Sequence, residues 1–211
     1  MLGAALALPM VAMAQQPATP DSRWILQRLA RPTPISTAFV EVRDSPLLKS
    51  PLRLRGEYQR PDARTLVRVV HAPYAETTRI DSASGQATVQ RGKTSRTIAL
   101  SRVPQLAALQ ASFADLLAGD AEAIERHYRM GTAGTRERWI MTMVPFEPSL
   151  AAGIRDITLY GRGSELRCIE TRPARGNELQ RTLLSSAAVQ AARIEDPAAL
   201  KRLCRSGRPA D

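Results

Sequence analysis

Three short runs between residues 38 and 70 alternate apolar and charged side chains. The apolar members of the first two runs are Ala38, Val40, Val42, Leu52, Leu54 and Tyr58. In the third run, Val67 and Val69 alternate with Leu66 and Arg68. Because successive side chains of a strand point to opposite faces, the pattern predicts antiparallel strands with their apolar groups on one face of a sheet. Such a face must be covered by other elements.

The hydrophobic period changes to that of a helix between residues 103 and 118. The apolar positions recur there at steps of three and four residues, and they are Leu106, Leu109, Phe113, Leu116 and Leu117. This spacing places them on one helical face. The period switch lies between two sets of alternating strands. It therefore predicts a curved antiparallel sheet with helices on its concave face and an apolar pocket between them.

Shorter helices are predicted elsewhere in the chain. A helix over residues 120–130 has Asp120 as its N-cap, with Ile124, His127 and Tyr128 on one side. Helical segments over 23–30 and 197–204 lie near the two ends of the chain. Residues 75–100 and 138–184 read as strands, with glycine turns such as Ser84-Gly85 and Gly92-Lys93 between the earlier ones.

The first fourteen residues carry no charge and end in Ala12-Met13-Ala14, the small-residue pattern that precedes signal peptidase cleavage. The alternative interpretation is a buried apolar helix. We expect residues 1–14 to be a signal peptide and residues 15–211 to form one exported domain. In an oxidising compartment the two cysteines, Cys168 and Cys204, are expected to form a disulfide. The alternative is a pair of free, buried thiols.

The distribution of charge and the absence of catalytic motifs exclude several classes of function. The net charge of +10 is spread along the chain, so an exported protein of this kind is not expected to bind nucleic acid. A functional alternative is attraction to anionic head groups or to an acidic partner surface. The two histidines, His71 and His127, have no metal-ligand spacing, and there is no G-x-S-x-G motif. We therefore expect no enzymatic activity, no metal and no cofactor.

The order of several short motifs is informative. A helix is followed by F-x-E-x-R from Phe39, by G-x-Y-x-R-P from Gly56 to Pro61, and by P-Y-x-E from Pro73. A helical insertion and a second set of strands come next. This order resembles the periplasmic outer-membrane lipoprotein carrier (LolA-like) family over about Trp24 to Leu184. An aromatic content of only 4% and a longer stretch between Pro61 and Pro73 indicate a divergent branch.

The resemblance implies an α+β fold: an incomplete antiparallel β-barrel, or strongly curved sheet, with helices covering its concave face as a lid over a hydrophobic cavity. It also implies a non-enzymatic periplasmic carrier. Such a carrier takes the acyl chains of lipoproteins or lipids from an inner-membrane donor complex and transfers them to an outer-membrane acceptor. The family's arginine at the Arg-Pro step holds the lid closed, and this role of lid latch falls on Arg60. The chain is expected to act as a monomer and not to span a membrane.

Eight residues are predicted to line the hydrophobic cavity: Phe39, Leu54, Tyr58, Leu66, Val89, Leu109, Phe113 and Met141. Methionines such as Met141 are adaptable liners, although a methionine-bearing strand is more often ordinary core. Two alternatives remain open. In the first, the protein is a carrier whose cargo is a non-protein lipid or a product of a polyketide or fatty-acid-type pathway. In the second, the same half-barrel serves as an envelope-stress sensor or interaction module. A third interpretation, a lipid hydrolase, is opposed by the missing nucleophile.

Overall fold

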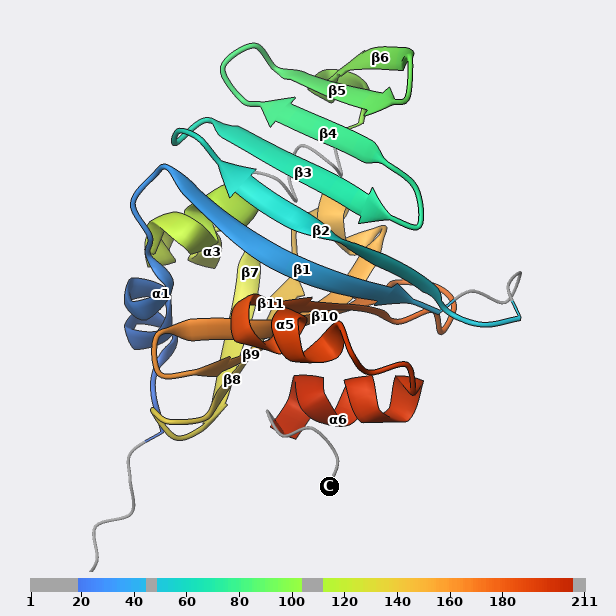
Figure 1. Cartoon of the computed structure of the whole chain (residues 1–211). Helices are drawn as coiled ribbons and strands as arrows, with labels where there is room; N and C mark the ends of the chain where they lie inside the picture. The colour runs from blue at the N-terminus through green and yellow to red at the C-terminus, as the bar shows by residue number, and fades with distance from the viewer. Residues whose placement is uncertain (1–18, 45–48, 104–111, 207–211) are drawn as a thin grey trace, which may run out of the picture.

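The computed structural model describes residues 19–44, 49–103 and 112–206. Their dominant feature is one antiparallel sheet of eleven strands in the order β6-β5-β4-β3-β2-β1-β11-β10-β9-β8-β7 (Figure 1). The strands are β1 (Ile35–Arg43), β2 (Leu52–Arg60), β3 (Thr65–Ala72), β4 (Glu76–Asp81), β5 (Gln86–Arg91), β6 (Thr94–Ala99), β7 (Tyr128–Gly134), β8 (Trp139–Pro145), β9 (Ile154–Arg162), β10 (Glu165–Pro173) and β11 (Gln180–Leu184). Strands β6 and β7 are the two edges, so the sheet is not closed. The predicted α+β class and the incomplete barrel are confirmed.

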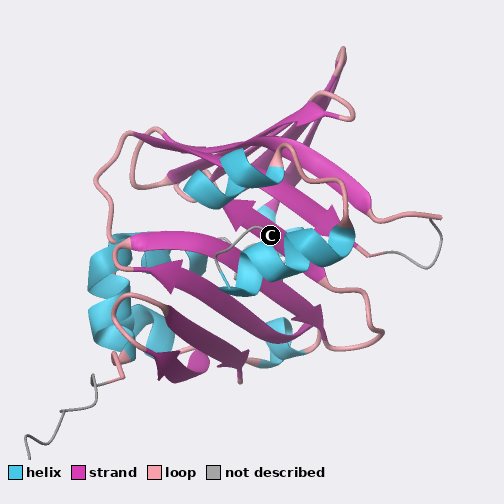
Figure 2. Ribbon diagram, turned by 60° about the horizontal axis from the view of Figure 1, so that its bottom comes forward, coloured by secondary structure: helices cyan, strands magenta, loops and turns pink. Residues whose placement is uncertain are grey.

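Helices lie on both sides of this sheet. They are α1 (Ser22–Leu29), the helical residues 112–118, α3 (Ala121–Glu125), α4 (Pro148–Ala151), α5 (Ser185–Ala191) and α6 (Pro197–Ser206), with a 3-10 turn over Leu100–Arg102. Helix α5 contacts β1, β10 and β11, and α6 contacts β10 and β11. Both lie together on one face of the sheet, while α1 and α3 lie on its other side (Figures 1 and 2).

The prediction that all apolar groups of the first strands share one face is wrong. In the register of β1 and β2, Phe39 lies opposite Gly56 and Glu41 lies opposite Leu54, so these side chains share the concave face. Val40 and Val42 point the other way, into a second core under α5 and α6. Residues 39–42 are all buried, because helices cover this part of the sheet on both faces.

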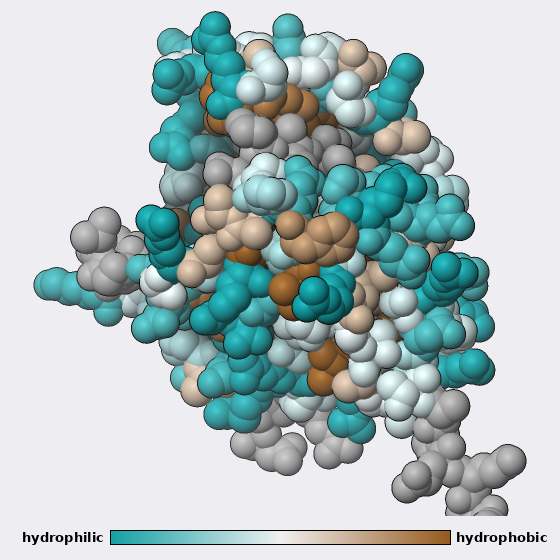
Figure 3. Space-filling view, turned by 180° about the vertical axis from the view of Figure 1, so that it is seen from behind, coloured by the Kyte–Doolittle hydropathy of each residue, from teal (hydrophilic) through white to brown (hydrophobic). Residues whose placement is uncertain are grey.

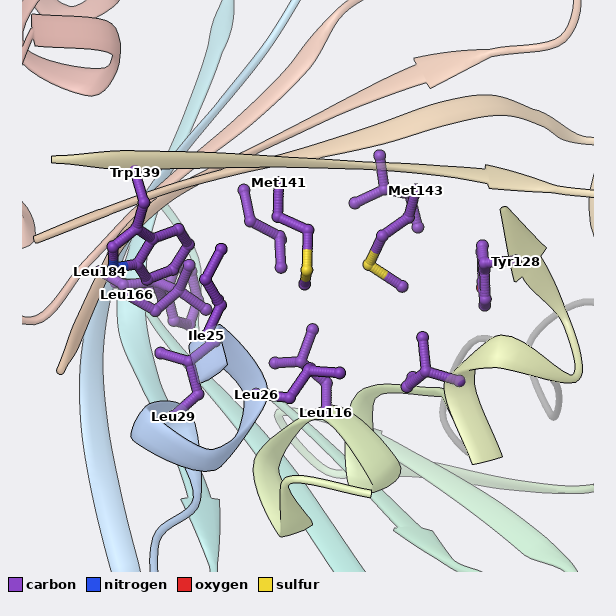
Figure 4. Packing of buried hydrophobic residues seen from close by; sticks show 14 of the residues in the cluster. Ile25, Leu26, Leu29, Leu116, Tyr128, Trp139, Met141, Met143, Leu166 and Leu184 are labelled. Carbon is purple, nitrogen blue, oxygen red and sulfur yellow. The ribbon is translucent and has the colours of Figure 1, made fainter. Parts of the chain in front are cut away.

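The larger core lies between the concave face and the helices α1, 112–118 and α3. Trp139, Met141 and Met143 of β8 project into it, and Ile25, Leu26 and Leu116 meet them from the helices (Figure 4). All six are at most 3% exposed. This half of the concave face, under β7 to β10, is therefore a packed interior. At about 25 cal/mol per Å² of apolar surface removed from water, such packing stabilises the contact between helices and sheet.

The predicted helix over residues 120–130 is too long. Asp120 does cap it, because its carboxylate accepts the Ala123 N–H at 2.9 Å. Helix α3 nevertheless ends at Glu125, and Tyr128 begins strand β7. The full pairing of β7 with β8 buries Tyr128 and overrides the helical pattern that Ile124, His127 and Tyr128 show in the sequence.

The convex core is closed by a covalent link that joins α6 to the sheet. Cys168 of β10 and Cys204 of α6 form a disulfide across 36 positions of sequence. Both are almost fully buried, beside Leu183 and Leu203. The short helix α5, which the alternation pattern did not predict, packs into the same core with Ala187, Ala188 and Ala191. The C-terminal segment is thus fixed to the face opposite the larger core.

Candidate functional site

An apolar pocket lies at the edge of the larger core, where the helical residues 112–118 (the covering helix) meet strands β1 and β2. Its volume is about 130 Å³. It is lined by Leu29, Arg31, Ile35, Thr37, Tyr58, Arg60, Phe113, Leu117, Ser164, Glu165, Leu166, Leu184 and Ser185. The walls thus come from α1, the covering helix, strands β1, β2, β10 and β11, the first residue of α5 and the loop between β9 and β10. Most of the lining surface is contributed by aliphatic and aromatic side chains.

Three aromatic rings in tilted contact, the aromatic cluster of Phe39, Tyr58 and Phe113, connect the sheet to the covering helix. The ring of Tyr58 lies 4.7 Å from that of Phe39 and 5.8 Å from that of Phe113, measured between centroids. Gly56 makes this packing possible, because a Cβ there would lie 1.8 Å from the Val69 carbonyl oxygen and 3.0 Å from the Phe39 ring. Aromatic pairs in this distance range contribute about 0.5–1.5 kcal/mol beyond burial. The pair of Tyr58 and Phe113 brings the covering helix into ring contact with the sheet.

Arg60, at the end of β2, lines this pocket and a smaller hollow beside it. The smaller one has a volume of about 10 Å³ and is lined by Arg60, Ala63, Thr65, Leu66, Phe113 and Ala114. Arg60 therefore lies next to the covering helix. Its side chain is buried, and its Nη1 has no hydrogen-bond partner among the described residues. Burial lowers the pKa of Arg60, and the nearby carboxylate of Asp62 opposes this shift.

A buried charge network borders the aromatic cluster on the concave face. Glu41 is fully buried and accepts hydrogen bonds from Arg43 at 2.6 Å, Arg68 at 3.3 Å and Gln180 at 3.2 Å. The Arg68 guanidinium lies 4.9 Å from the centre of the Phe39 ring. Burial raises the pKa of the neighbouring Tyr58 hydroxyl, and the charge of Glu41 acts in the same direction.

The network continues across the sheet to β4 and β5. Arg68 approaches Glu76 at 3.9 Å, and Glu76 pairs with Arg91 at 2.6 Å. The same strands also carry a small apolar cluster of Ile80, Ala87 and Leu100, in which Ile80 lies opposite Leu66 of β3. Seen from behind, apolar side chains gather near the top of the molecule, at the height of the strands β3 to β6 of Figure 1, among hydrophilic neighbours (Figure 3).

The predicted cavity residues fall into distinct places. Tyr58 and Phe113 line the larger pocket with Arg60, and Leu66 lines the smaller hollow. Phe39 and Leu54 lie behind them in the core, and Met141 is fully buried in the packed half. Val89 is half-buried on β5 and lines none of the described pockets. Leu109, like the proposed signal peptide, lies outside the described residues.

Several pocket residues were not predicted. Leu29, Ile35, Leu117, Leu166 and Leu184 form much of its apolar wall. Leu117 has the expected helical spacing, and this signal placed it on the apolar face of a helix without assigning it to a cavity. Glu41 and Arg68 were expected on the wet face, because charged residues in an alternating strand usually face solvent. Only the pairing register of β1 reveals that Glu41 faces inward.

Other kinds of site find no support in the described parts of the chain. Within residues 19–44, 49–103 and 112–206, no three His, Cys, Asp or Glu side chains cluster in a way that suits a metal ion. No helix of these segments is long and apolar enough to cross a membrane. The described residues thus form an open antiparallel sheet with an apolar pocket between it and a covering helix, which is the architecture of a half-barrel fold.

The comparisons with known proteins agree with this class. The model of the family described as "Outer membrane lipoprotein carrier protein LolA-like" matches residues 14–207. The chain therefore belongs to the LolA-like family, a family of lipoprotein carriers, and the resemblance noted in the sequence is confirmed. No curated protein matches the chain.

Two solved structures are similar over most of their length. A LolA superfamily protein from Nitrosomonas europaea is 10% identical, with a TM-score of 0.41, and the match covers 80% of this chain and 92% of that protein. LprF from Mycobacterium bovis is 13% identical, with a TM-score of 0.35, and the match covers 80% of this chain and 94% of LprF.

Proposed function

We propose that this protein is a periplasmic carrier that binds acyl chains of lipoproteins or lipids under the covering helix and transfers them towards the outer membrane. The observation that supports this most is the apolar pocket bounded by Tyr58, Phe113 and Leu117, in a member of a carrier family. Each CH₂ group that leaves water gains about 0.8 kcal/mol. A long acyl chain therefore needs a protected apolar site to cross an aqueous compartment.

The size of the pocket implies that the carrier opens to load. A cavity of roughly 150 Å³ lined by aliphatic and aromatic groups holds one benzene molecule. The pocket of about 130 Å³ thus has room for only a short part of an acyl chain. Loading requires the covering helix to move away from β2, breaking the contact between Tyr58 and Phe113. The structure then corresponds to the closed, empty state, and the covering helix to the lid.

Arg60 is proposed to act as the latch of this lid. It lies beside Phe113 and Ala114, and its Nη1 has an unused donor. A small shift of the covering helix that offers a carbonyl to this donor forms a charge-assisted hydrogen bond worth roughly 1.5–3 kcal/mol. Such a bond is absent from the structure as it stands and forms only when the covering helix moves closer to Arg60, so it favours the empty carrier and the release of cargo.

The same proposal includes the export of the protein and the partners that load and unload it. Residues 1–14 are removed as a signal peptide on export, and residues 15–211 act as one domain in the periplasm. An inner-membrane donor complex loads the carrier, and an outer-membrane acceptor receives the cargo. The disulfide between Cys168 and Cys204 supports an oxidising compartment.

A fluorescent acyl probe tests the site directly. Probe binding should be saturable, and Phe113→Asp should weaken it at least tenfold, because an unpaired charge in a dry pocket is costly. Val144→Asp is the matched control, since Val144 is 40% exposed on β8 and lines none of the described pockets. If both folded variants bind the probe as the wild type does, the pocket is not the acyl site.

A further inference from the structure

A second hollow lies on the face of the sheet that carries α6. Its lining is rich in positive charge, whereas a site for a lipid tail is apolar. It has a volume of about 80 Å³ and is lined by Arg138, Trp139, Ile140, Tyr160, Gly161, Arg162, Arg167, Cys204, Arg205 and Ser206. Four of these residues are arginines and none is acidic. The disulfide holds Cys204 of α6 against β10 at one wall of the hollow.

Arg167 is the buried arginine of this group. It is 6% exposed, whereas Arg138, Arg162 and Arg205 are exposed and form the rim. Its Nη1 donates to the Ser186 hydroxyl at 2.7 Å. Its Nε and Nη2 are buried and have no hydrogen-bond partner among the described residues. These two atoms are closed to solvent in the structure, so an anion reaches them only when the exposed rim side chains move aside. A buried guanidinium with unused donors is costly, and an oxyanion that then pairs with it gains more here than at an exposed arginine.

The two unused nitrogens have a specific geometry. Nε and Nη2 form one edge of the planar guanidinium, with two parallel N–H groups that match two oxygens of an anion. Arg205 shows the same edge in use, since its Nε lies 3.2 Å and its Nη2 3.0 Å from Oε2 of Glu170. In Arg167 this edge has no such partner.

The nearby carboxylates do not supply the missing acceptor. Glu170 is already paired with Arg181 at 2.9 Å and with Arg205. Glu165 lies 3.7 Å from Nη1 of Arg167, on the edge that is already used, and it accepts the Ser186 N–H at 2.9 Å. Among the described residues, Arg138 and Arg162 therefore have no ion pair, and Arg167 has only the 3.7 Å approach of Glu165 to the edge that is already used.

We propose that this hollow binds a phosphate group. A phosphate ester carries up to two negative charges at neutral pH and several strong acceptor oxygens, so it can use the free edge of Arg167 and the rim arginines together. The volume of about 80 Å³ is half of the roughly 150 Å³ that holds the six carbons of benzene, and it suits a group of phosphate size. The group comes either from a phospholipid head group or from a soluble phosphate. The site is separate from the acyl pocket and does not depend on the proposed carrier function.

Calorimetric titration of the exported chain with inorganic phosphate tests the proposal. Saturable binding at one site is expected. Arg167→Met should raise the Kd about 10- to 100-fold, as the loss of a charge-assisted bidentate pair predicts. Arg126→Met removes the same charge from an exposed position next to α3 and should leave the Kd unchanged. No saturable binding, or an equal loss in both variants, would overturn the site.

A second variant tests the site in case Arg167→Met does not fold. Arg162 is exposed and makes no ion pair or side-chain hydrogen bond with the described residues, so Arg162→Met should fold and still weaken phosphate binding severalfold. An Arg162→Met protein with the Kd of the Arg126→Met control would contradict the proposal. Phosphatidylglycerol vesicles distinguish the sources. Binding to them that Arg167→Met weakens assigns the site to lipid head groups, whereas phosphate binding without vesicle binding assigns it to a soluble phosphate.

Discussion

The link between Cys168 and Cys204 should provide a large part of the stability of the fold. The two residues are 36 positions apart in the sequence. In the chain-entropy model, closing a loop of this size lowers the entropy of the unfolded chain enough to stabilise the native state by about 4 kcal/mol at 25 °C. Native domains are stable by only about 5–15 kcal/mol, so reduction should remove a quarter or more of the total.

The assay is urea unfolding with and without a reductant. The unfolding free energy should fall by about 4 kcal/mol in the reductant, and the melting temperature by roughly 8–15 °C for a chain of this length. The double variant Cys168→Ala/Cys204→Ala is the control. It should be insensitive to reductant and slightly less stable than the reduced wild type, because it also loses two buried sulfur atoms at positions with at most 2% exposure.

Two results would refute this reasoning. One is a reductant effect below about 1 kcal/mol in the wild type, which would mean that the loop adds little to the entropy difference. The other is two reactive thiols in the denatured, non-reduced protein, which would mean that the bond is not formed.

Three further outcomes are expected. Arg60→Leu should raise cargo affinity about tenfold to a hundredfold and slow handover to an acceptor, and unchanged binding and release rates would exclude the latch. Burial raises the pKa of Glu170, but hydrogen bonds and charge from Arg205 and Arg181 outweigh it and hold the pKa below the ordinary 4.5. Glu170 therefore stabilises the fold above about pH 4.5 and loses this contribution as the pH falls through its folded-state pKa. The variant Glu170→Gln should lose less unfolding free energy on acidification than the wild type does. An equally steep loss in the variant would contradict this. Glu41→Ala should cost about 3–5 kcal/mol by leaving Arg68 without its buried partner, and a change below 1 kcal/mol in urea unfolding would show that the network is not needed.

Strand β1 shows how far the sequence could predict the fold and the site. Alternation correctly marked residues 38–43 as a strand, because the backbone alone sets that period, although β1 begins three residues earlier at Ile35. It could not say that helices α5 and α6 cover the face of Val40 and Val42, since that depends on contacts with residues about 150 positions away. For the same reason, Glu41 was expected in solvent although it faces the core.

The pocket was only partly predictable for a related reason. Tyr58, Phe113 and Arg60 were named from strand alternation, helical spacing and a family motif, and all three line one pocket. Met141 has the same alternation as Tyr58, but it lies where α1 and the covering helix fill the space. Whether an inward-facing residue meets a neighbour or a hollow depends on the volumes that pack against it, and periodicity does not contain that information.

Arg167 could not have been singled out from the sequence. The pairing of β10 with β9 shifts register between Leu166 and Cys168, so Leu166 enters the larger core while Cys168 faces α6. A bulge of this kind places the residue between them outside the normal alternation. It is this local irregularity that leaves a buried arginine beside α6.

The carrier account is tested most directly by native mass spectrometry of the protein exported to and purified from its own periplasm. The account predicts a polypeptide mass that begins at Gln15, together with a second population whose added mass yields acyl-chain fragments on dissociation. Adducts of acylated peptide would identify a lipoprotein cargo, and adducts of free lipid would identify a non-protein cargo. Only bare polypeptide, in a preparation that also fails to bind an acyl probe, would contradict the account.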